Sequence, residues 1–185
     1  GKCLKVENPL QNVRAPRKKI GFINKKSGRL YYRIIFPVEE TKEKVPVFFY
    51  VYGGPHVQLI TDKFGSSTKG LEETMASSGF ITFCIDPRGS ANRGYEFESA
   101  IYQQINRPQM EDYDDALDWF FKEYEGYVDK TKLFIYGWSF GGYISLSMLL
   151  NSRHRFKLGI AGGAVVDWRY YEVMYTERYM GERKD

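Results

Sequence analysis

The chain has 185 residues, which is long enough for one domain with a buried core. Hydrophobic residues make up 43% and charged residues 27%, a balance that excludes a disordered chain and favours a globular one. The net charge of +4 is small, and the densest basic run, Arg14 to Lys19, is typical of a solvated surface segment, so we expect no nucleic-acid partner.

The first elements predict a linker followed by three strands. Residues 1–18 carry prolines and scattered charge, which is typical of a linker. Strand-like runs at 19–23 and 30–36 flank a Lys-Lys-Ser-Gly turn, so they are expected to form a hairpin. The apolar run at 47–52 has the length and composition of a strand that is buried on both faces.

From there on, helix and strand patterns alternate, and this alternation is typical of an α/β fold. Helices between buried strands imply parallel pairing, and ligands in such sheets bind at the carboxyl ends of the strands. That rule singles out the loops after Tyr52, Ile85, Tyr136 and Ala161. The expected elements are a helix at 69–78, a strand at 80–85, two helices between 95 and 124, a strand at 133–136, a helix at 141–150 and a strand at 158–161.

The segment 137–142 (GWSFGG) contains a Gly-x-Ser-x-Gly motif between an expected strand and an expected helix. In this context a tight turn lifts the serine hydroxyl out of the backbone, where a histidine can take its proton. The glycines leave room for neighbouring backbone, and the Phe140 N–H lies at a helix start, where it can stabilise developing negative charge. We therefore predict Ser139 as a nucleophile; the alternative is a glycine-rich turn with an incidental serine.

The loop after the strand at 47–52 reads Tyr52-Gly53-Gly54-Pro55-His56. In many hydrolases this loop supplies an oxyanion donor from its backbone, and here the Tyr52 phenol can donate instead. Taken alone, a Gly-Gly-Pro sequence usually marks only a turn, and we expect no direct role for His56.

Aromatic residues gather after the last expected strand. Trp168, Tyr171 and Tyr175 are spaced three and four apart, so on a helix they share one face, and Asp167 is suited to cap that helix. Such a stripe is more often core than pocket, but its place beyond the carboxyl end of a strand favours a pocket.

Neither the cysteines nor the histidines form a metal-binding pattern. Cys3 and Cys84 are not arranged as a CxxC pair, no His/Cys cluster occurs, and Cys84 lies in an apolar run typical of a buried side chain. We expect no metal, no other cofactor and no disulfide framework. No secretory signal or transmembrane run is visible in the sequence.

Several motifs occur together in an order that resembles the catalytic domain of the dipeptidyl peptidase IV branch of the prolyl oligopeptidase family. The resemblance runs from about Ile20 to the end of the chain, and Trp138 and the run at 175–181 are its most branch-specific parts. The motifs are 51–55 (VYGGP), 86–90 (DPRGS), 137–143 (GWSFGGY), 168–171 (WRYY) and 175–181 (YTERYMG).

The resemblance implies a truncated α/β-hydrolase fold and a set of roles. Ser139 is the implied nucleophile, and the Tyr52 hydroxyl and Phe140 amide are the implied oxyanion hole. The family commonly has tyrosine at the position of Phe140, so a hydroxyl near the pocket is lost here. The implied walls of the pocket for the residue before the scissile bond, usually proline, are Phe140, Val165, Trp168, Tyr171 and Tyr175.

The other two members of a catalytic triad are expected outside this chain. In α/β hydrolases the acid and the histidine follow the serine, and the only later histidine here is His154. It is expected near the far end of the helix that begins at the nucleophile, roughly 20 Å away, which is too far for a base. We expect the sheet to stop before its last strands and the chain alone to be inactive.

The resemblance also implies a larger protein. A β-propeller would precede the catalytic domain, with residues 1–18 as its exit linker and 19–185 as the N-terminal part of the hydrolase. Peptide substrates, a periplasmic or extracytoplasmic location and a homodimer of the full-length protein are implied in the same way. Three functions remain open: a dipeptidyl peptidase selective for proline or alanine in the second position, another acyl hydrolase such as an oligopeptidase or esterase, and a non-catalytic module.

Overall fold

The structure, a computed structural model, describes residues 14–63, 68 and 70–182. Most of the expected linker, 1–13, and Cys3 therefore lie outside the described residues. The elements are β1 (Lys18–Lys25), β2 (Gly28–Ile35), β3 (Val45–Tyr50), α1 (Leu71–Ser77), β4 (Ile81–Asp86), α2 (Tyr95–Ser99), α3 (Arg107–Glu123), β5 (Val128–Trp138), α4 (Phe140–Asn151), β6 (Leu158–Gly162), the 3₁₀ turn η1 (Trp168–Tyr170) and α5 (Val173–Met180).

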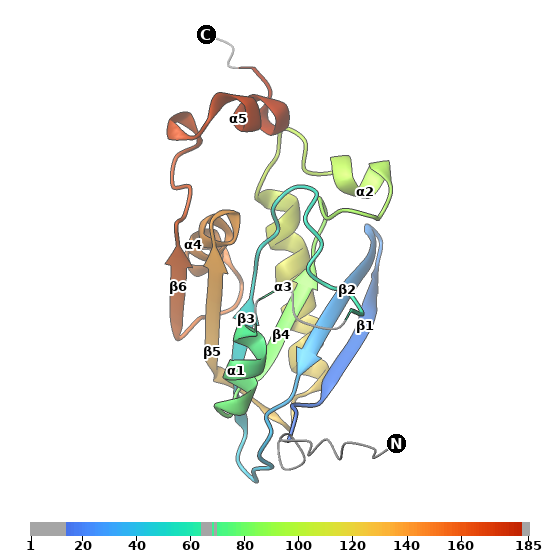
Figure 1. Cartoon of the computed structure of the whole chain (residues 1–185), viewed down its shortest axis with the longest axis vertical. Helices are drawn as coiled ribbons and strands as arrows, with labels where there is room; N and C mark the ends of the chain where they lie inside the picture. Colours follow the sequence, from blue (N-terminus) through green and yellow to red (C-terminus); the bar gives the residue numbers. More distant parts are fainter. Residues whose placement is uncertain (1–13, 64–67, 69, 183–185) are drawn as a thin grey trace, which may run out of the picture.

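The six strands form one mixed sheet in the order β1-β2-β4-β3-β5-β6 (Figure 1). β1 and β2 form the expected antiparallel hairpin, and β2 also pairs antiparallel with β4. β3, β4, β5 and β6 run parallel to one another, as the alternation of helices and strands predicts. The order of elements expected from the sequence is confirmed, and the fold is that of an α/β hydrolase.

Strand and helix bounds differ from the expected ones at several ends. β3 ends at Tyr50, so Tyr52 belongs to the loop that follows it. β5 is longer than the expected strand at 133–136, since it begins at Val128 and reaches Trp138, the residue before Ser139. The helix that follows begins at Phe140, one residue earlier than expected. Ser139 therefore directly follows the end of its strand, whereas Tyr52 lies two residues beyond the end of β3.

The main core lies between the sheet and the helices α3 and α4, while α1 covers the opposite face (Figure 1). β4 is buried on both faces, with Phe83 in the main core and Cys84 in a smaller cluster on the other side. Burial raises the pKa of the Cys84 thiol well above its usual value, so this side chain is the inert, buried cysteine that the sequence predicts.

α3 holds the sheet from the side of the main core. The helix packs on the sheet through apolar side chains, of which Tyr113, Leu117 and Phe120 are fully inaccessible. The Asn106 N–H donates to the Gln109 side-chain oxygen at 3.0 Å, which satisfies one donor at the start of the helix. The position of this helix matters for the candidate site, because its first turns contact the loop after β3.

The four parallel strands end on the side of the molecule that carries α2 and α5 (Figure 1). The loops after β3, β4, β5 and β6 therefore meet at one edge, as the sequence predicts. In the described part of the chain, no helix is both long and apolar enough to cross a membrane.

Candidate active site

Ser139 occupies the sharp turn between β5 and α4. Its backbone has φ 57° and ψ −117°, a conformation that costs a residue with a side chain on the order of 1–3 kcal/mol. Two backbone hydrogen bonds maintain it: the Ser139 N–H donates to the Gly162 carbonyl at 2.8 Å, and the Ser139 carbonyl accepts from Tyr143 at 3.1 Å. The half-buried serine is thus fixed in the strained turn that a nucleophile requires.

The glycines on either side of the serine are required by close backbone contacts. A Cβ on Gly137 would lie 2.1 Å from the Gly141 carbonyl oxygen, and a Cβ on Gly141 would lie 2.4 Å from the Val51 carbonyl oxygen. The prediction that these glycines leave room for neighbouring backbone is confirmed. Because Gly141 packs on the chain at Val51, the serine turn and the loop after β3 are in direct contact.

α3 fixes the loop that carries Tyr52. The Tyr52 N–H donates to the Tyr113 hydroxyl at 3.3 Å, and the Gln109 side chain donates to the Gly53 carbonyl at the same distance. Gly54 has no space for a side chain, since a Cβ there would lie 2.5 Å from the Tyr52 ring. The loop is therefore hydrogen-bonded to α3, and Gly54 packs directly against the Tyr52 ring.

The structure brings Tyr52 and Phe140 together, as the sequence predicts. Their rings lie 6.4 Å apart, and Phe140 is the first residue of α4, where backbone N–H groups have no acceptor within the helix. Burial, and then the nearby Tyr171 phenol, raises the pKa of the Tyr52 hydroxyl. Tyr52 therefore stays protonated at neutral pH, and one hydroxyl donor and one amide donor belong to adjacent segments.

A cluster of aromatic rings lies beside these donors. We call it the aromatic cluster. Trp168 is its centre: its ring lies 5.6 Å from Phe140, 5.8 Å from Tyr171 and 5.9 Å from Tyr175. Tyr143 and Tyr179 extend the cluster at its two ends. Its members are Phe140, Tyr143, Trp168, Tyr171, Tyr175 and Tyr179.

The prediction that Trp168, Tyr171 and Tyr175 share the face of one helix is wrong. Trp168 belongs to η1, Tyr171 is extended, and α5 begins only at Val173. The two short elements have separate caps, since Asp167 accepts from the Arg169 N–H and Glu172 accepts from the Tyr175 N–H. The rings nevertheless converge, and the Thr176 hydroxyl of α5 donates to the Trp168 carbonyl of η1 at 3.3 Å.

The remaining residues of the predicted pocket are placed as follows. Val165 is half-buried in the segment between β6 and η1. Sequence reasoning did not include Tyr143 or Tyr179 among the pocket residues. Each follows a predicted member by one helical turn, Tyr143 after Phe140 and Tyr179 after Tyr175, and that spacing was the available signal.

The Asp167 carboxylate at the edge of the aromatic cluster is paired with Arg169. Hydrogen bonds from the exposed Arg169 guanidinium and its N–H lower the pKa of Asp167 to about 2. Burial and neighbouring phenols, first that of Tyr52, raise the pKa of the Tyr175 hydroxyl. The surface that the cluster presents at neutral pH is therefore composed of neutral rings.

The DPRGS segment at 86–90 supports the site from behind. The Asp86 carboxylate accepts the Leu59 and Ile60 N–H groups at 2.8 and 3.0 Å, which anchors the continuation of the Tyr52 loop. Arg88 forms an ion pair with Asp112 of α3 at 3.0 Å. The motif thus ties the loop after β4 to both the loop after β3 and the helix beneath it.

The two histidines lie at different ends of the molecule. His56 follows the Tyr52 loop, with its Nδ1 3.2 Å from Glu98 Oε2. His154 follows α4, whose first residue adjoins Ser139, and the length of that 12-residue helix, about 18 Å, separates the two ends. The His154 Nε2 lies 3.2 Å from Asp118 Oδ1 and 3.3 Å from the Asp114 carbonyl. The His154 imidazole therefore contacts Asp114 and Asp118 of α3, far from Ser139.

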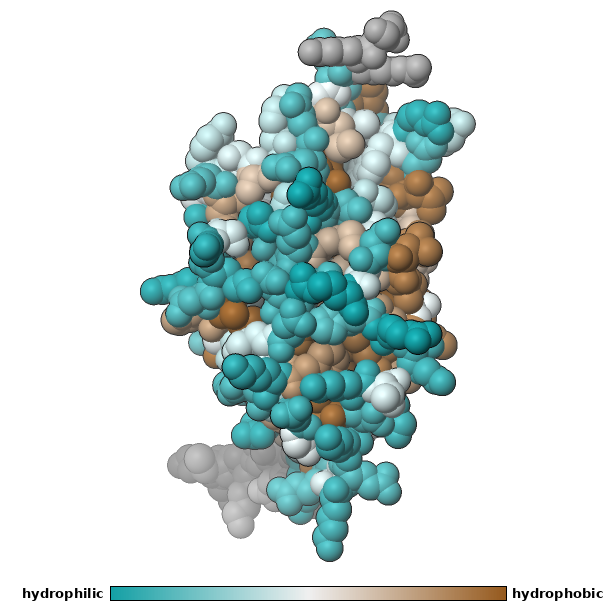
Figure 2. All heavy atoms as spheres, turned by 180° about the vertical axis from the view of Figure 1, so that it is seen from behind, coloured by the Kyte–Doolittle hydropathy of each residue, from teal (hydrophilic) through white to brown (hydrophobic). Residues whose placement is uncertain are grey.

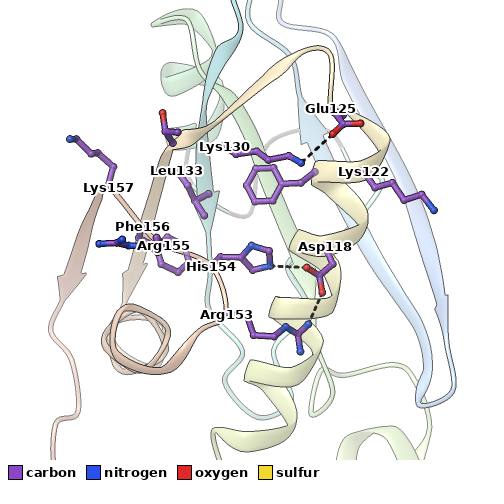
Figure 3. A pocket seen from close by; sticks show the side chains of 12 residues that line it. Asp118, Lys122, Glu125, Lys130, Leu133, Arg153, His154, Arg155, Phe156 and Lys157 are labelled. Carbon is purple, nitrogen blue, oxygen red and sulfur yellow. Dashed lines mark hydrogen bonds and ion pairs between the residues drawn. The ribbon is translucent and has the colours of Figure 1, made fainter.

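His154 also lines a cavity of about 810 Å³ at the amino ends of β5 and β6, away from Ser139. Figure 3 shows Asp118 between His154 and Arg153, and Lys130 paired with Glu125 across the cavity. In the part of the chain that the structure describes, no group of three or more His, Cys, Asp and Glu side chains could hold a metal ion.

Known proteins are similar to this chain in sequence and in fold. The sequence profile of the Prolyl oligopeptidase family matches residues 67–185. Dipeptidyl peptidase 8 of Mus musculus is 37% identical over 139 residues, covering 75% of this chain and 16% of that protein. Prolyl endopeptidase FAP of Bos taurus is 33% identical over 177 residues, covering 95% of this chain and 23% of that protein.

Two solved structures superimpose well on the chain. The crystal structure of Porphyromonas gingivalis dipeptidyl peptidase 4 matches with a TM-score of 0.81 and 33% identity, covering 91% of this chain and 24% of that one. A Bacteroides ovatus protein provisionally named dipeptidyl aminopeptidase IV matches with a TM-score of 0.86 and 40% identity, covering 95% of this chain and 25% of that one. The chain therefore spans a quarter or less of the length of each of these relatives.

Proposed function

The chain belongs to the dipeptidyl peptidase IV branch of the prolyl oligopeptidase family, and we propose that it is part of a serine peptidase that releases dipeptides from peptides with proline or alanine in the second position. One observation carries this proposal above the others. The strained turn at Ser139 is followed at once by Phe140, whose ring lies 6.4 Å from that of Tyr52 and 5.6 Å from that of Trp168.

In the proposed reaction, the Ser139 hydroxyl oxygen attacks the carbonyl carbon of the second residue of the substrate. Its proton passes to a base and then to the leaving amine, while an ester forms at the serine and is later hydrolysed by water. His154 is engaged at the far end of α4. We propose that the base and its orienting carboxylate come from parts of the full-length protein outside these 185 residues.

The oxyanion of the tetrahedral intermediate is proposed to accept from two donors. One is the Phe140 N–H at the start of α4, where the partial positive charge of the helix adds to the hydrogen bond. The other is the Tyr52 hydroxyl, whose raised pKa keeps its proton in place. The contact of Gly141 with Val51 supports this arrangement, because it holds the two donor segments at a fixed separation.

The aromatic cluster, with Val165 beside it, is proposed to receive the side chain of the residue before the cleaved bond. Neutral rings from Phe140, Trp168, Tyr171 and Tyr175 suit a compact, apolar group. Proline fits such a slot at low entropic cost, because its ring has little rotamer freedom to lose. The loss of a hydroxyl at Phe140, compared with the tyrosine common in the family, leaves the slot more apolar.

The names of the relatives all support activity on peptides, but they indicate two different kinds of peptidase. One set of relatives is named dipeptidyl peptidase and the other prolyl endopeptidase. We favour the dipeptidase because both solved structures carry names of that class. We further propose that the chain from β1, which begins at Lys18, is the N-terminal part of the hydrolase domain, and that the residues before it are a linker from an upstream domain. A homodimer of the full-length protein is proposed from the family alone.

The test uses the full-length protein and a pair of chromogenic amides, one with a free Gly-Pro amino terminus and one with that terminus acetylated. A dipeptidase cleaves only the free form and an endopeptidase also cleaves the blocked form, whereas an esterase cleaves neither amide although its serine is labelled. No turnover of either amide, together with no labelling of Ser139 by a fluorophosphonate, would identify a non-catalytic module. Light scattering of the same sample tests the dimer.

A further inference from the structure

His56 lies on the same loop as Tyr52 and has an unusual backbone. Its φ is 59°, in the left-handed region that residues with side chains rarely adopt. The His56 N–H donates to the Gly89 carbonyl at 2.8 Å, which fixes the loop against the segment after β4. The conformation is thus maintained by a specific contact, and it directs the imidazole away from the loop.

The imidazole joins this loop to α2. Its Nδ1 lies 3.2 Å from Glu98 Oε2, and the Glu98 side chain is mostly buried while the imidazole is about half exposed. Both residues line a cavity of about 280 Å³ between α2 and α5, together with Tyr95, Tyr102, Arg178 and Tyr179. Glu98 therefore holds the imidazole at the wall of a space between two helices.

The other face of the imidazole meets the aromatic cluster. The His56 ring lies 5.9 Å from the Tyr179 ring, and Tyr179 lies 4.8 Å from Tyr175. The Tyr179 carbonyl accepts from the Gln103 N–H at 2.7 Å, which fixes the end of α5 to the segment after α2. A continuous set of contacts thus runs from Glu98 through His56 and Tyr179 to Tyr175.

Two parts of the candidate site therefore depend on one side chain. The backbone of His56 continues to Tyr52, the proposed oxyanion donor, and its ring touches the back of the aromatic cluster, the proposed slot for the substrate side chain. A shift of the imidazole would change the position of the donor relative to the slot. Misplacement of a reacting group by about 1 Å can cost a factor of about 100 in rate.

We propose that His56, held by Glu98, is a positioning residue that couples the oxyanion donor to the slot, so that turnover depends on how well the residue before the cleaved bond fits. The inference rests on the proposed function. It assigns to the His56–Glu98 pair a role in selectivity between proline and other residues at that position.

The experiment compares variants of the full-length protein on free Gly-Pro and Gly-Ala amides. His56→Gly removes the imidazole without strain, since glycine accepts a positive φ. His56→Asn tolerates the same φ and keeps a donor near the position of Nδ1. Glu98→Ala removes the partner, and the double variant His56→Gly/Glu98→Ala completes the cycle.

A matched control pair exists at the far end of the molecule. His154 and Asp118 are also separated by 3.2 Å, and they lie away from the site. His154→Gly and Asp118→Ala therefore report what the loss of a histidine–carboxylate pair does to the protein in general. Melting temperature and fluorophosphonate labelling are measured for every variant, because they report folding and an accessible serine.

We expect His56→Gly to lower kcat/KM for the proline amide and the proline-over-alanine ratio, each by about tenfold, with Glu98→Ala close behind. The double variant should lose no more than His56→Gly, His56→Asn should recover most of the ratio, and the control pair should leave the ratio unchanged. A ratio unchanged in His56→Gly, or reduced equally in the control pair, overturns the inference while leaving the proposed function intact. A parent protein without proline preference overturns both.

Discussion

The indole ring of Trp168 stacks on the phenol ring of Tyr175, with the ring centroids 5.9 Å apart and an angle of 4° between the ring planes. The two residues belong to different short elements, each with its own cap. Tyr171 packs edge-on against both rings, so the three form a rigid corner with apolar faces.

That corner predicts a preference among substrates. In a series that varies only the residue before the cleaved bond, we expect proline first and alanine next, because a compact apolar group fits between ring faces with little entropy to lose. Rates of amide cleavage by the full-length protein measure this order. A preference for lysine or arginine would contradict a slot built from neutral rings.

Ser139→Ala is expected to lower turnover of the full-length protein by on the order of 10⁴- to 10⁶-fold, since no other atom at the turn can form the ester. Fluorophosphonate labelling should disappear in the same variant. Ser77→Ala, on an exposed position of α1, is the control and should change neither measurement. Residual activity within tenfold of the parent would exclude Ser139 as the nucleophile.

Tyr52→Phe should lower kcat with little change in KM, because the hydroxyl bonds most strongly to the charge of the transition state. The expected loss is about 2.7–4 kcal/mol of transition-state stabilisation, the range for one oxyanion donor. Tyr50→Phe is the matched control: it removes a half-buried phenol with a pKa raised to about 12 from the strand that leads into the loop. If only KM changes in Tyr52→Phe, the hydroxyl contacts the substrate without stabilising the oxyanion.

Gly141→Ala is expected to damage the site through the backbone. The added methyl would meet the Val51 carbonyl at 2.4 Å and the Tyr52 Cα at 3.1 Å, so the donor loop must move away from the serine turn. Overpacking of this kind costs about 1–3 kcal/mol of stability, and we expect turnover to fall further than the melting temperature indicates. Gly126→Ala, which meets nothing within 4 Å, should be neutral in both measurements.

β6 is an edge strand of the sheet, and apolar side chains gather along this side of the molecule (Figure 2). Leu158 and Ile160 are each about half exposed there. A polypeptide of these 185 residues alone is therefore expected to self-associate through this edge. Leu158→Lys with Ile160→Lys should shift the species seen by light scattering towards a monomer, and a wild-type monomer at high concentration would contradict the expectation.

The sequence patterns were sufficient for the order of the elements because burial leaves a periodic signal along the chain. A continuous apolar run predicted the buried strand β3, and the alternation of helix and strand patterns predicted β4 and a helix in the region of α3. The antiparallel pairing of β2 with β4 was not predicted, because strand direction depends on connections that a local pattern does not encode.

The site was predictable where its geometry is local. The Gly137, Ser139 and Gly141 spacing determines the strained turn directly. The segment at 168–175 was wrongly predicted as one helical face because spacing alone cannot reveal that Glu172 starts a second helix. The pairing of His56 with Glu98 joins residues distant in sequence, and no periodicity connects them.

The Ser139 N–H donates to the carbonyl of Gly162, a residue that is synthesised later than the serine. A ribosome releases residue 139 well before residue 162, so a nascent chain that ends within α4 has no acceptor for this N–H. The strained conformation of the serine must then wait until β6 docks beside β5. We therefore expect the serine turn to form only after β6 has been synthesised, because shorter nascent chains lack one of the two hydrogen bonds that maintain it.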